Sequence, residues 1–355
     1  MTEIIPQVYE IIMDLVKRGK YATMESFVDI AIRNQITLEK SAIQERNRDV
    51  HEVKSTASIY VQLRKNIQQN LLTTPAISID DKRRSTPIWG LINRFVPSKV
   101  VLRILVNALV QFKTQWIDFK QFSDDAVSIA SQIRNHTEKF ERRSDVVRGQ
   151  SLKIGFPKKD PKSQQRFVDL FIGKLRNENY LSGLLGDLEL AVIKKSQQGN
   201  QNNTLIGITE GGLKWANMDS PFVDDFILSL KPIQSPLSYE ETGFLLSRIK
   251  ETKPGDYEFL KYIYRLVREG ENTPDKLSDH ISLYFDSLKL NPAMFSTFQT
   301  GGIARLVEMR IIQLDKSGIH TRYKLKSSAS TLEELQQSIA KYKHSTRIVS
   351  NDTNT

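Results

Sequence analysis

The first forty residues, MTEIIPQVYEIIMDLVKRGKYATMESFVDIAIRNQITLEK (Met1–Lys40), predict two amphipathic helices separated by a tight turn. In the first helix the apolar residues follow a spacing of three and four, which places them on one stripe. Gly19 suits the left-handed position that ends a helix, and Thr23 suits the cap of the next one. Two such short helices cannot bury both stripes alone, so we expect them to form a dimer interface. Its expected residues are Val8, Ile11, Ile12, Leu15, Phe27, Ile30 and Ala31.

The stretch GKYATMESFVDIAIR (residues 19–33) resembles the inter-helix turn and second helix of ribbon-helix-helix proteins. The resemblance implies an obligate homodimer whose N-terminal strands pair and read the DNA major groove. The only candidate strand here, residues 2–5, lacks the Arg, Lys, Asn or Gln residues used for base readout. The resemblance therefore supports self-association better than DNA reading. The alternative is a helical hairpin packed on a neighbouring domain.

The composition is that of a globular protein of 355 residues, with 39% hydrophobic and 26% charged residues and a net charge of +10. Most of the charge excess lies in residues 139–176, where eleven Lys or Arg face four acids. Such a surplus favours a polyanionic partner. Zero cysteines exclude disulfides and thiolate metal sites. With no signal peptide and no spanning apolar run, we expect a cytoplasmic, nucleoid-associated protein without a membrane, metal or cofactor.

The order of patterns predicts a mainly α fold with short β-hairpins, in the α+β class. Residues 41–71 have apolar residues at heptad positions, which indicates one long helix, either a coiled coil or a helix lying on its own domain. Residues 72–97 resemble a linker by composition. Two larger domains follow, at 98–236 and 237–326. Residues 327–355 are expected to form a final helix and a disordered tail.

The first of these domains carries a helix over 181–189, a hairpin, and a second helix from Thr209. The stretch LIGITEGGLKWA (residues 205–216) resembles the exit from the wing of winged-helix regulators, in which a recognition helix precedes a two-stranded hairpin. The resemblance makes the polar loop 197–203 the wing tip. The alternative is a solvated hairpin turn that touches nothing.

The second domain repeats this order of elements. A Ser238–Glu241 capping box and two cap-proline pairs, Thr273-Pro274 and Asn291-Pro292, mark helix starts. A helix over 298–308 then leads to strands at 310–314 and 320–325. By the same resemblance, this helix would be a recognition helix. Its Gly301-Gly302 pair has two explanations, close approach to DNA or to another helix, or a turn before the helix.

These patterns nominate residues for nucleic-acid contact. Side chains able to read bases are Gln299, Thr300 and Arg305. Side chains able to neutralise phosphate are Lys153, Lys158, Lys159, Lys162, Arg322 and Lys324. The alternatives are that Arg305 is an exposed helix charge, that Arg322 faces Asp315 across its hairpin, and that the lysines are solvated.

The expected function is sequence-specific DNA binding by a dimeric transcriptional regulator, not an enzyme. A plasmid replication initiator or partition protein, and a winged-helix adaptor for protein contacts, remain alternatives. A nuclease is a remote one, because Asp118-Phe119-Lys120 has an acid-x-Lys form and Asp80 or Asp81 could supply a second carboxylate. The five histidines show no metal-ligand spacing. The sequence does not reveal a small-molecule effector.

Overall fold

The computed structural model describes residues 6–19, 23–28, 62–65, 71–77, 80–141, 151–176, 180–198, 201–229, 231–287, 291–315, 321–326 and 332–337. The chain divides into two compact units, Met1–Ser58 and Ile59–Thr355. The expected strand at 2–5, most of the helix at 41–71, the dimer residues Ile30 and Ala31, the tip of the first hairpin and the tail lie outside the described residues.

The first unit contains helix α1 (Pro6–Lys17), and a second helix is described over residues 24–28. Gly19 ends the turn after α1 with a φ of 68°, as its sequence position predicts. Thr23 and Ser26 cap the second helix by donating their amides to each other's hydroxyl oxygens, both at 3.1 Å. The helix–turn–helix pattern of the sequence is therefore confirmed in the described part.

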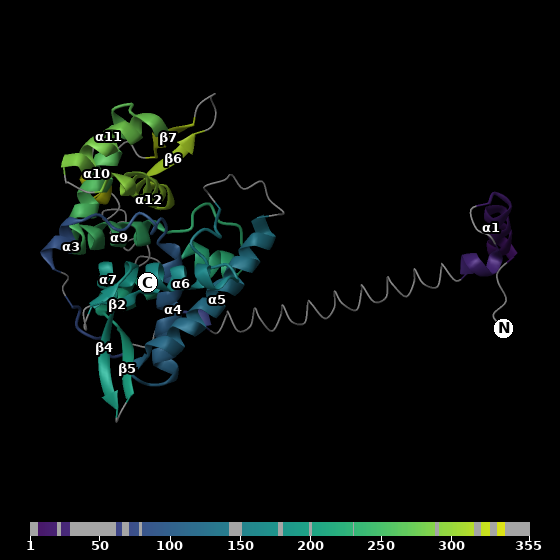
Figure 1. Cartoon of the computed structure of the whole chain (residues 1–355), viewed down its shortest axis with the longest axis horizontal. Helices are drawn as coiled ribbons and strands as arrows, with labels where there is room; N and C mark the ends of the chain where they lie inside the picture. Colours follow the sequence, from purple (N-terminus) through teal and green to yellow (C-terminus); the bar gives the residue numbers. More distant parts are fainter. Residues whose placement is uncertain are drawn as a thin grey trace, which may run out of the picture. The chain divides into compact units, whose positions relative to one another are not determined.

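The second unit is mainly helical (Figure 1). Its helices are α3 (Asp81–Ser85), α4 (Val96–Gln111), α5 (Phe119–Glu141), α6 (Pro161–Phe167), the π-helix η1 (Val168–Ile172), α7 (Leu184–Asp187), α8 (Glu210–Asn217), the π-helix η2 (Pro221–Ile227), α9 (Tyr239–Thr252), α10 (Pro254–Arg268), α11 (Pro274–Ser287), the 3₁₀ turn η3 (Pro292–Met294) and α12 (Phe295–Glu308). Its strands are β1 (Ile117–Asp118), β2 (Lys174–Arg176), β3 (Tyr180–Ser182), β4 (Ala191–Gln198), β5 (Gln201–Ile208), β6 (Ile312–Asp315) and β7 (Arg322–Leu325).

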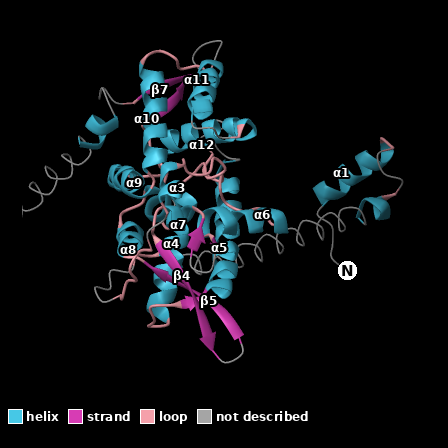
Figure 2. Ribbon diagram, turned by 60° about the vertical axis from the view of Figure 1, so that its left-hand side comes forward, coloured by secondary structure: helices cyan, strands magenta, loops and turns pink. Residues whose placement is uncertain are grey.

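The largest sheet is antiparallel with the order β1-β5-β4. The β4–β5 hairpin stays paired as far as Gln198 opposite Gln201, so it is longer than the sequence pattern predicts. Figure 2 shows this hairpin extending from the helical body. The strands β2 and β3 form one small hairpin, and β6 and β7 form another.

The β4–β5 and β6–β7 hairpins share their backbone pairing. In each, the residue after the second strand donates to the residue before the first strand, Thr209 to Leu190 and Lys326 to Ile311, both at 3.1 Å. On its other edge, the second strand of each hairpin pairs with a segment that lies between two helices in the sequence. For β5 this neighbour is β1, between α4 and α5, and for β7 it is Asn272, whose carbonyl accepts from Tyr323 N at 2.8 Å between α10 and α11. A hairpin with this closure and this outer neighbour therefore occurs twice in the unit.

The expected linker at 72–97 is wrong in its second part, because apolar residues from Ile88 onward belong to the core. Ile88, Ile92 and Phe95 are 0–1% exposed. Further upstream, Thr74 donates its amide to Ile208 O at 2.8 Å and so continues the pairing beside β5. In the sequence, these apolar residues are spaced four and three apart, but the polar and proline-rich residues around them obscure this pattern.

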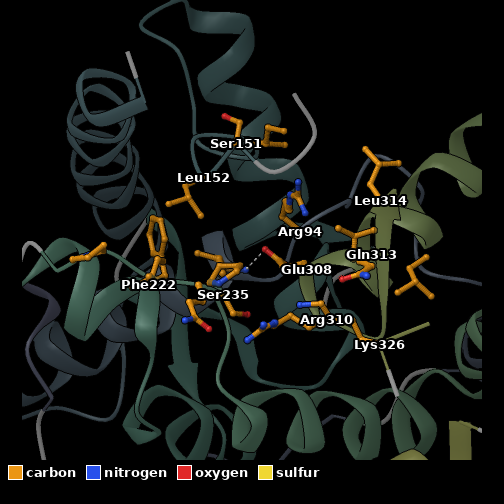
Figure 3. Close-up of a pocket in the computed structure, with 18 of the residues that line it drawn as sticks. Arg94, Ser151, Leu152, Phe222, Ser235, Glu308, Arg310, Gln313, Leu314 and Lys326 are labelled. Carbon is orange, nitrogen blue, oxygen red and sulfur yellow. Dashed lines mark hydrogen bonds between the residues drawn. The ribbon is translucent and has the colours of Figure 1, made fainter. Parts of the chain in front are cut away.

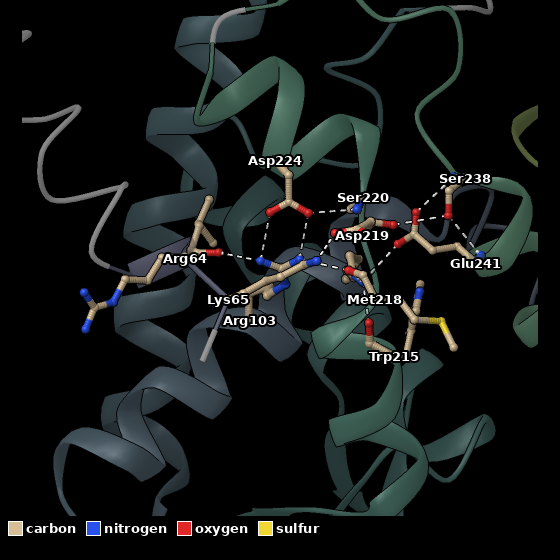
Figure 4. A network of polar contacts seen from close by, with 12 residues as sticks. Arg64, Lys65, Arg103, Trp215, Met218, Asp219, Ser220, Asp224, Ser238 and Glu241 are labelled. Atoms are coloured by element: carbon tan, nitrogen blue, oxygen red, sulfur yellow. Dashed lines mark hydrogen bonds and ion pairs between the residues drawn. The ribbon is translucent and has the colours of Figure 1, made fainter. Parts of the chain in front are cut away.

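A buried ion pair joins the two halves of this unit, which correspond to the expected domains 98–236 and 237–326 (Figure 4). The Lys99 ammonium of α4 contacts the Glu241 carboxylate of α9 at 3.0 Å, and both side chains are completely buried. Lys99 also donates to the carbonyl oxygens of Trp215 and Met218. Two carbonyl oxygens and one carboxylate thus surround the ammonium group, which offsets part of the cost of burying the charge. The capping box predicted at Ser238 is present, but its Glu241 is also this lysine's partner.

A second pair, from Arg103 of α4 to Asp224 of η2, is bidentate at 3.1 and 3.0 Å. The same guanidinium donates to Leu63 O at 2.9 Å, which fixes residues 62–65 against α4. The Lys99–Glu241 pair crosses the expected boundary between separate domains at residues 236 and 237, and one continuous hydrophobic core runs through both halves.

Candidate nucleic-acid interface

Four cationic side chains gather on and just before α6. Asp160 caps this helix by accepting from Ser163 N at 2.8 Å, and Pro161 occupies its first turn. Lys158, Lys159, Lys162 and Arg166 are all exposed, and we call them the α6 surface. Lys162 and Arg166 are one helical turn apart and therefore lie on one face. Within the described part of the chain, none of the four takes part in an ion pair.

The helix that carries this surface is firmly anchored. Phe167, at the end of α6, and Phe171 in η1 are 2–3% exposed and pack with ring centroids 5.6 Å apart. Ser98 of α4 donates its hydroxyl to Phe171 O at 2.9 Å. The η1 segment packs against α4, α5 and α7. The charged face is thus held on a rigid base and turned away from the core.

Lys153, expected as a phosphate contact, differs from these four cations because it lies near two carboxylates. Its ammonium is 3.5 Å from Glu138 and 3.7 Å from Glu141, two carboxylates of α5. Glu141 also accepts from the amide of Leu152, which ties the loop to the helix end. The structure therefore separates Lys153, which is already neutralised, from Lys158, Lys159 and Lys162.

Arg305 is the clearest correction. It is completely buried, donates to Ile92 O at 2.7 Å, and forms an ion pair with Asp256 at 2.7 Å. Asp256 also accepts from Ile88 N at 3.0 Å. The expectation that Arg305 reads a base, and the alternative that it is an exposed helix charge, are both wrong. The sequence pattern around Arg305 does not reveal this burial, because most arginines are exposed.

The two other expected base readers lie on the outer part of α12. Thr300 is exposed and donates its hydroxyl to Ser296 O at 2.7 Å, and Gln299 is half-buried and donates to Pro274 O at 3.2 Å. Both line an open hollow between α12 and the β6–β7 hairpin. Its other lining residues are apolar apart from the Tyr323 hydroxyl, so this face of α12 carries no cation.

The glycine pair in α12 serves packing between segments of the chain. A Cβ on Gly301 would lie 2.3 Å from the carbonyl oxygen of Gly90, and one on Gly302 would lie 2.7 Å from the Phe259 ring. Close approach to another helix was one of the two expectations for this pair. The neighbours are α10 and the 80–95 segment, which leaves no room for DNA at these two positions.

The second hairpin places its two cations differently. Arg322 is exposed and stands opposite Asp315 in the register. Lys324 forms an ion pair with Asp315 at 2.5 Å. For Lys324, the geometry thus supports the alternative in which Asp315 compensates a positive charge on this hairpin.

The expected recognition helix at 181–189 is also wrong. Residues 180–182 form β3, and α7 is a single buried turn, Leu184–Asp187. The basic helix α6 lies upstream of it and was missed, although Asp160-Pro161 is the same cap-proline signal that marks Thr273-Pro274 and Asn291-Pro292. Reading that signal would have placed Lys162 and Arg166 on one helix.

The carboxylates considered for a nuclease have capping roles. Asp118 accepts from Gln121 N at 2.8 Å at the start of α5, and Asp80 accepts from Arg83 N at 2.9 Å at the start of α3. In the described ranges no three acidic, histidine or cysteine side chains are grouped for a metal ion. Among the described helices, none has the length and apolar content needed to span a bilayer.

Comparisons with protein-family models, with curated proteins and with solved structures gave no match for this chain.

Proposed function

We propose that this protein binds DNA as a homodimer and that the α6 surface is its main phosphate-contacting face. The observation that carries the proposal is the cluster of exposed cations without ion-pair partners on a rigidly anchored helix. Such a surface gains affinity by releasing counterions from the DNA backbone, which does not require exact placement of each side chain.

The order of elements supports a winged-helix interpretation. Helices α4, α5 and α6–η1 precede the β4–β5 hairpin, with β2, β3 and the single turn α7 in between, and this hairpin would act as a wing. The second part has a similar arrangement, α10, α11, α12 and β6–β7, without a counterpart of β2 and β3. In the second copy the helix before the hairpin has no exposed cation, so we assign backbone contact to the first copy. A role in transcription regulation, and association with the nucleoid, belong to this proposal.

The direct test is DNA binding measured by fluorescence anisotropy on labelled duplexes at several salt concentrations. For the unchanged protein, the logarithm of the affinity should fall linearly as the logarithm of the salt concentration rises. Lys159→Glu/Lys162→Glu should weaken binding to all sequences alike and reduce the slope by about 0.9 for each lost contact. Both substitutions place acids at the N-terminus of α6, where the helix dipole tolerates them, so the fold should be retained.

The matched control is Lys82→Glu/Lys250→Glu, which reverses two exposed lysines on α3 and α9. It makes the same change in net charge away from α6. If the control and the α6 variant lose the same affinity, binding follows net charge alone and the proposed interface is wrong. A flat salt response in the unchanged protein would remove DNA as the partner.

A second candidate within the same class is a replication initiator with tandem winged helices. The observation that favours it is the presence of two hairpins, each preceded by helices, on one continuous core. Mapping of chromosomal and plasmid occupancy in the native host would distinguish the two. A single site at an origin would support the initiator, whereas several promoter sites would support the regulator.

A further inference from the structure

A cavity of about 390 Å³ lies where the two halves of the second unit meet (Figure 3). Its walls come from the 94–96 segment, the end of α5 with the following loop, the 232–236 segment, and the end of α12 with β6. This volume falls within the range of small-ligand sites. Leu152, Ile154, Phe222 and Ile233 make one side of the cavity apolar.

Three cations, Arg94, Arg310 and Lys326, line the same cavity together with one carboxylate, Glu308. Glu308 accepts from the amides of Phe95 and Val96. Burial raises the pKa of Glu308 to about 7, against the opposing effect of the nearby Arg94. The carboxyl group is therefore only partly ionised at neutral pH. The three cations outnumber this one carboxylate, so the cavity is electropositive.

Arg310 and Lys326 are close enough to influence each other. Partial burial, together with the Arg310 charge, lowers the pKa of Lys326. In the portion of the chain that is described, neither side chain has a carboxylate partner. Two neighbouring cations without a counter-ion repel each other, and a bound anion would remove that cost.

The backbone at Arg310 adds an independent observation. Arg310 has a φ of 57°, a conformation that residues with a side chain rarely adopt and that favours glycine at a helix end. The corresponding residue before the β4–β5 hairpin, Glu189, also has a positive φ, but its carboxylate pairs with Arg248 at 3.3 Å. At the second hairpin the arginine side chain is kept at an unfavourable backbone position and is turned to the cavity wall.

Ser235 supplies a further unsatisfied group. It is 7% exposed and lines the cavity, and its hydroxyl has no hydrogen-bond partner among the described residues. A buried hydroxyl without a partner costs stability. A ligand oxygen in the cavity could satisfy it.

We propose that this cavity binds a phosphomonoester with an apolar body, the phosphate lying between Arg310, Lys326 and Ser235 and the body against Phe222 and Leu152. A phosphomonoester carries about −1.5 to −2 charges at pH 7, which matches the excess of positive charge better than a single carboxylate. The apolar wall of the cavity would contact the organic part of the ligand. The proposal is independent of DNA binding, because none of these residues belongs to the α6 surface.

The test uses 1-naphthyl phosphate as the probe and the full-length protein, by isothermal titration at physiological ionic strength. We expect saturable binding, with 1-naphthol and inorganic phosphate each binding at least about tenfold more weakly. Arg310→Gly should fold, because glycine suits the positive φ, and should lose at least about tenfold in affinity through the missing charged hydrogen bonds. Lys326→Gln should show a similar loss.

The matched control is Lys324→Gln, two residues earlier on β7, because Lys324 pairs with Asp315 and does not line the cavity. Its affinity for the probe should be unchanged. Three results would overturn the proposal: no binding by the unchanged protein, equal binding of naphthol and naphthyl phosphate, or equal loss in Lys324→Gln and Lys326→Gln. Thermal unfolding of Arg310→Gly without ligand separates loss of the site from loss of the fold.

Discussion

At the scale of single residues, the interior of this protein holds several paired charges. Lys99, Arg103 and Arg305 are 0–1% exposed and each has a carboxylate partner. Charged residues are almost never fully buried unless they are paired. Each of these cations also donates to backbone carbonyl oxygens, so its position fixes neighbouring segments as well as its partner.

Replacing Arg305 by Met should destabilise the protein by about 3 to 5 kcal/mol, because Asp256 would remain buried without its partner. The double variant Arg305→Met/Asp256→Asn should recover part of that loss, since Asn keeps an acceptor for Ile88 N without a charge. Urea denaturation followed by circular dichroism measures both. Equal stability of Arg305→Met and the unchanged protein would contradict the structural role.

At the scale of elements, α12 is held in place by a backbone-to-backbone approach. Gly301 lies against Gly90, with no space for a side chain on either residue. Glycine in a helix interior costs about 1 kcal/mol relative to alanine. This cost is offset by letting α12 approach the 80–95 segment, which brings Arg305 within reach of Ile92 O.

Gly301→Ala should therefore destabilise the protein by about 1 to 3 kcal/mol, despite the better helix propensity of alanine. The control is Gly211→Ala in α8, where a Cβ would meet only the Arg248 side chain at 3.5 Å. This control should be neutral or stabilising. Thermal unfolding of the two variants shows whether the steric cost or the gain in helix propensity is larger. A stabilised Gly301→Ala would mean that the close contact with Gly90 is absent in solution.

At the scale of the whole molecule, the chain combines two compact units with separate tasks in the proposed function. In the first unit Ile12 is 3% exposed whereas its neighbour Ile11 is 62% exposed. A large exposed apolar side chain on an amphipathic helix suits a partner surface. Self-association would also double the number of α6 surfaces available to one DNA molecule.

We expect the protein to be a dimer and Ile11→Glu to shift it toward monomer, because the substitution places a charge in the apolar interface. Glu10→Gln, at an exposed neighbouring position, should leave the dimer intact. Size exclusion with light scattering over a range of concentrations measures both. A monomeric unchanged protein, or a dimer that Ile11→Glu does not weaken, would refute the assignment of the interface.

The sequence by itself determined the mainly helical class and most helix starts, because caps, prolines and apolar spacing act within a few residues. Thr23, Thr209 and the Ser238–Glu241 box are examples that the structure confirms. The β4–β5 and β6–β7 hairpins were also predicted from alternating residues and turns, although β4 and β5 are longer than expected. The basic character of residues 158–162 was evident from composition alone.

Only the tertiary structure decided which charges are exposed. Arg305 and Lys162 both lie on helices, yet one is paired in the core and the other faces solvent. That difference depends on Asp256, which lies 49 residues from Arg305 along the chain. The inclusion of residues 88–95 in the core and the cavity between the halves have the same origin. Each depends on segments that meet only after folding, and local sequence patterns carry no information about such contacts.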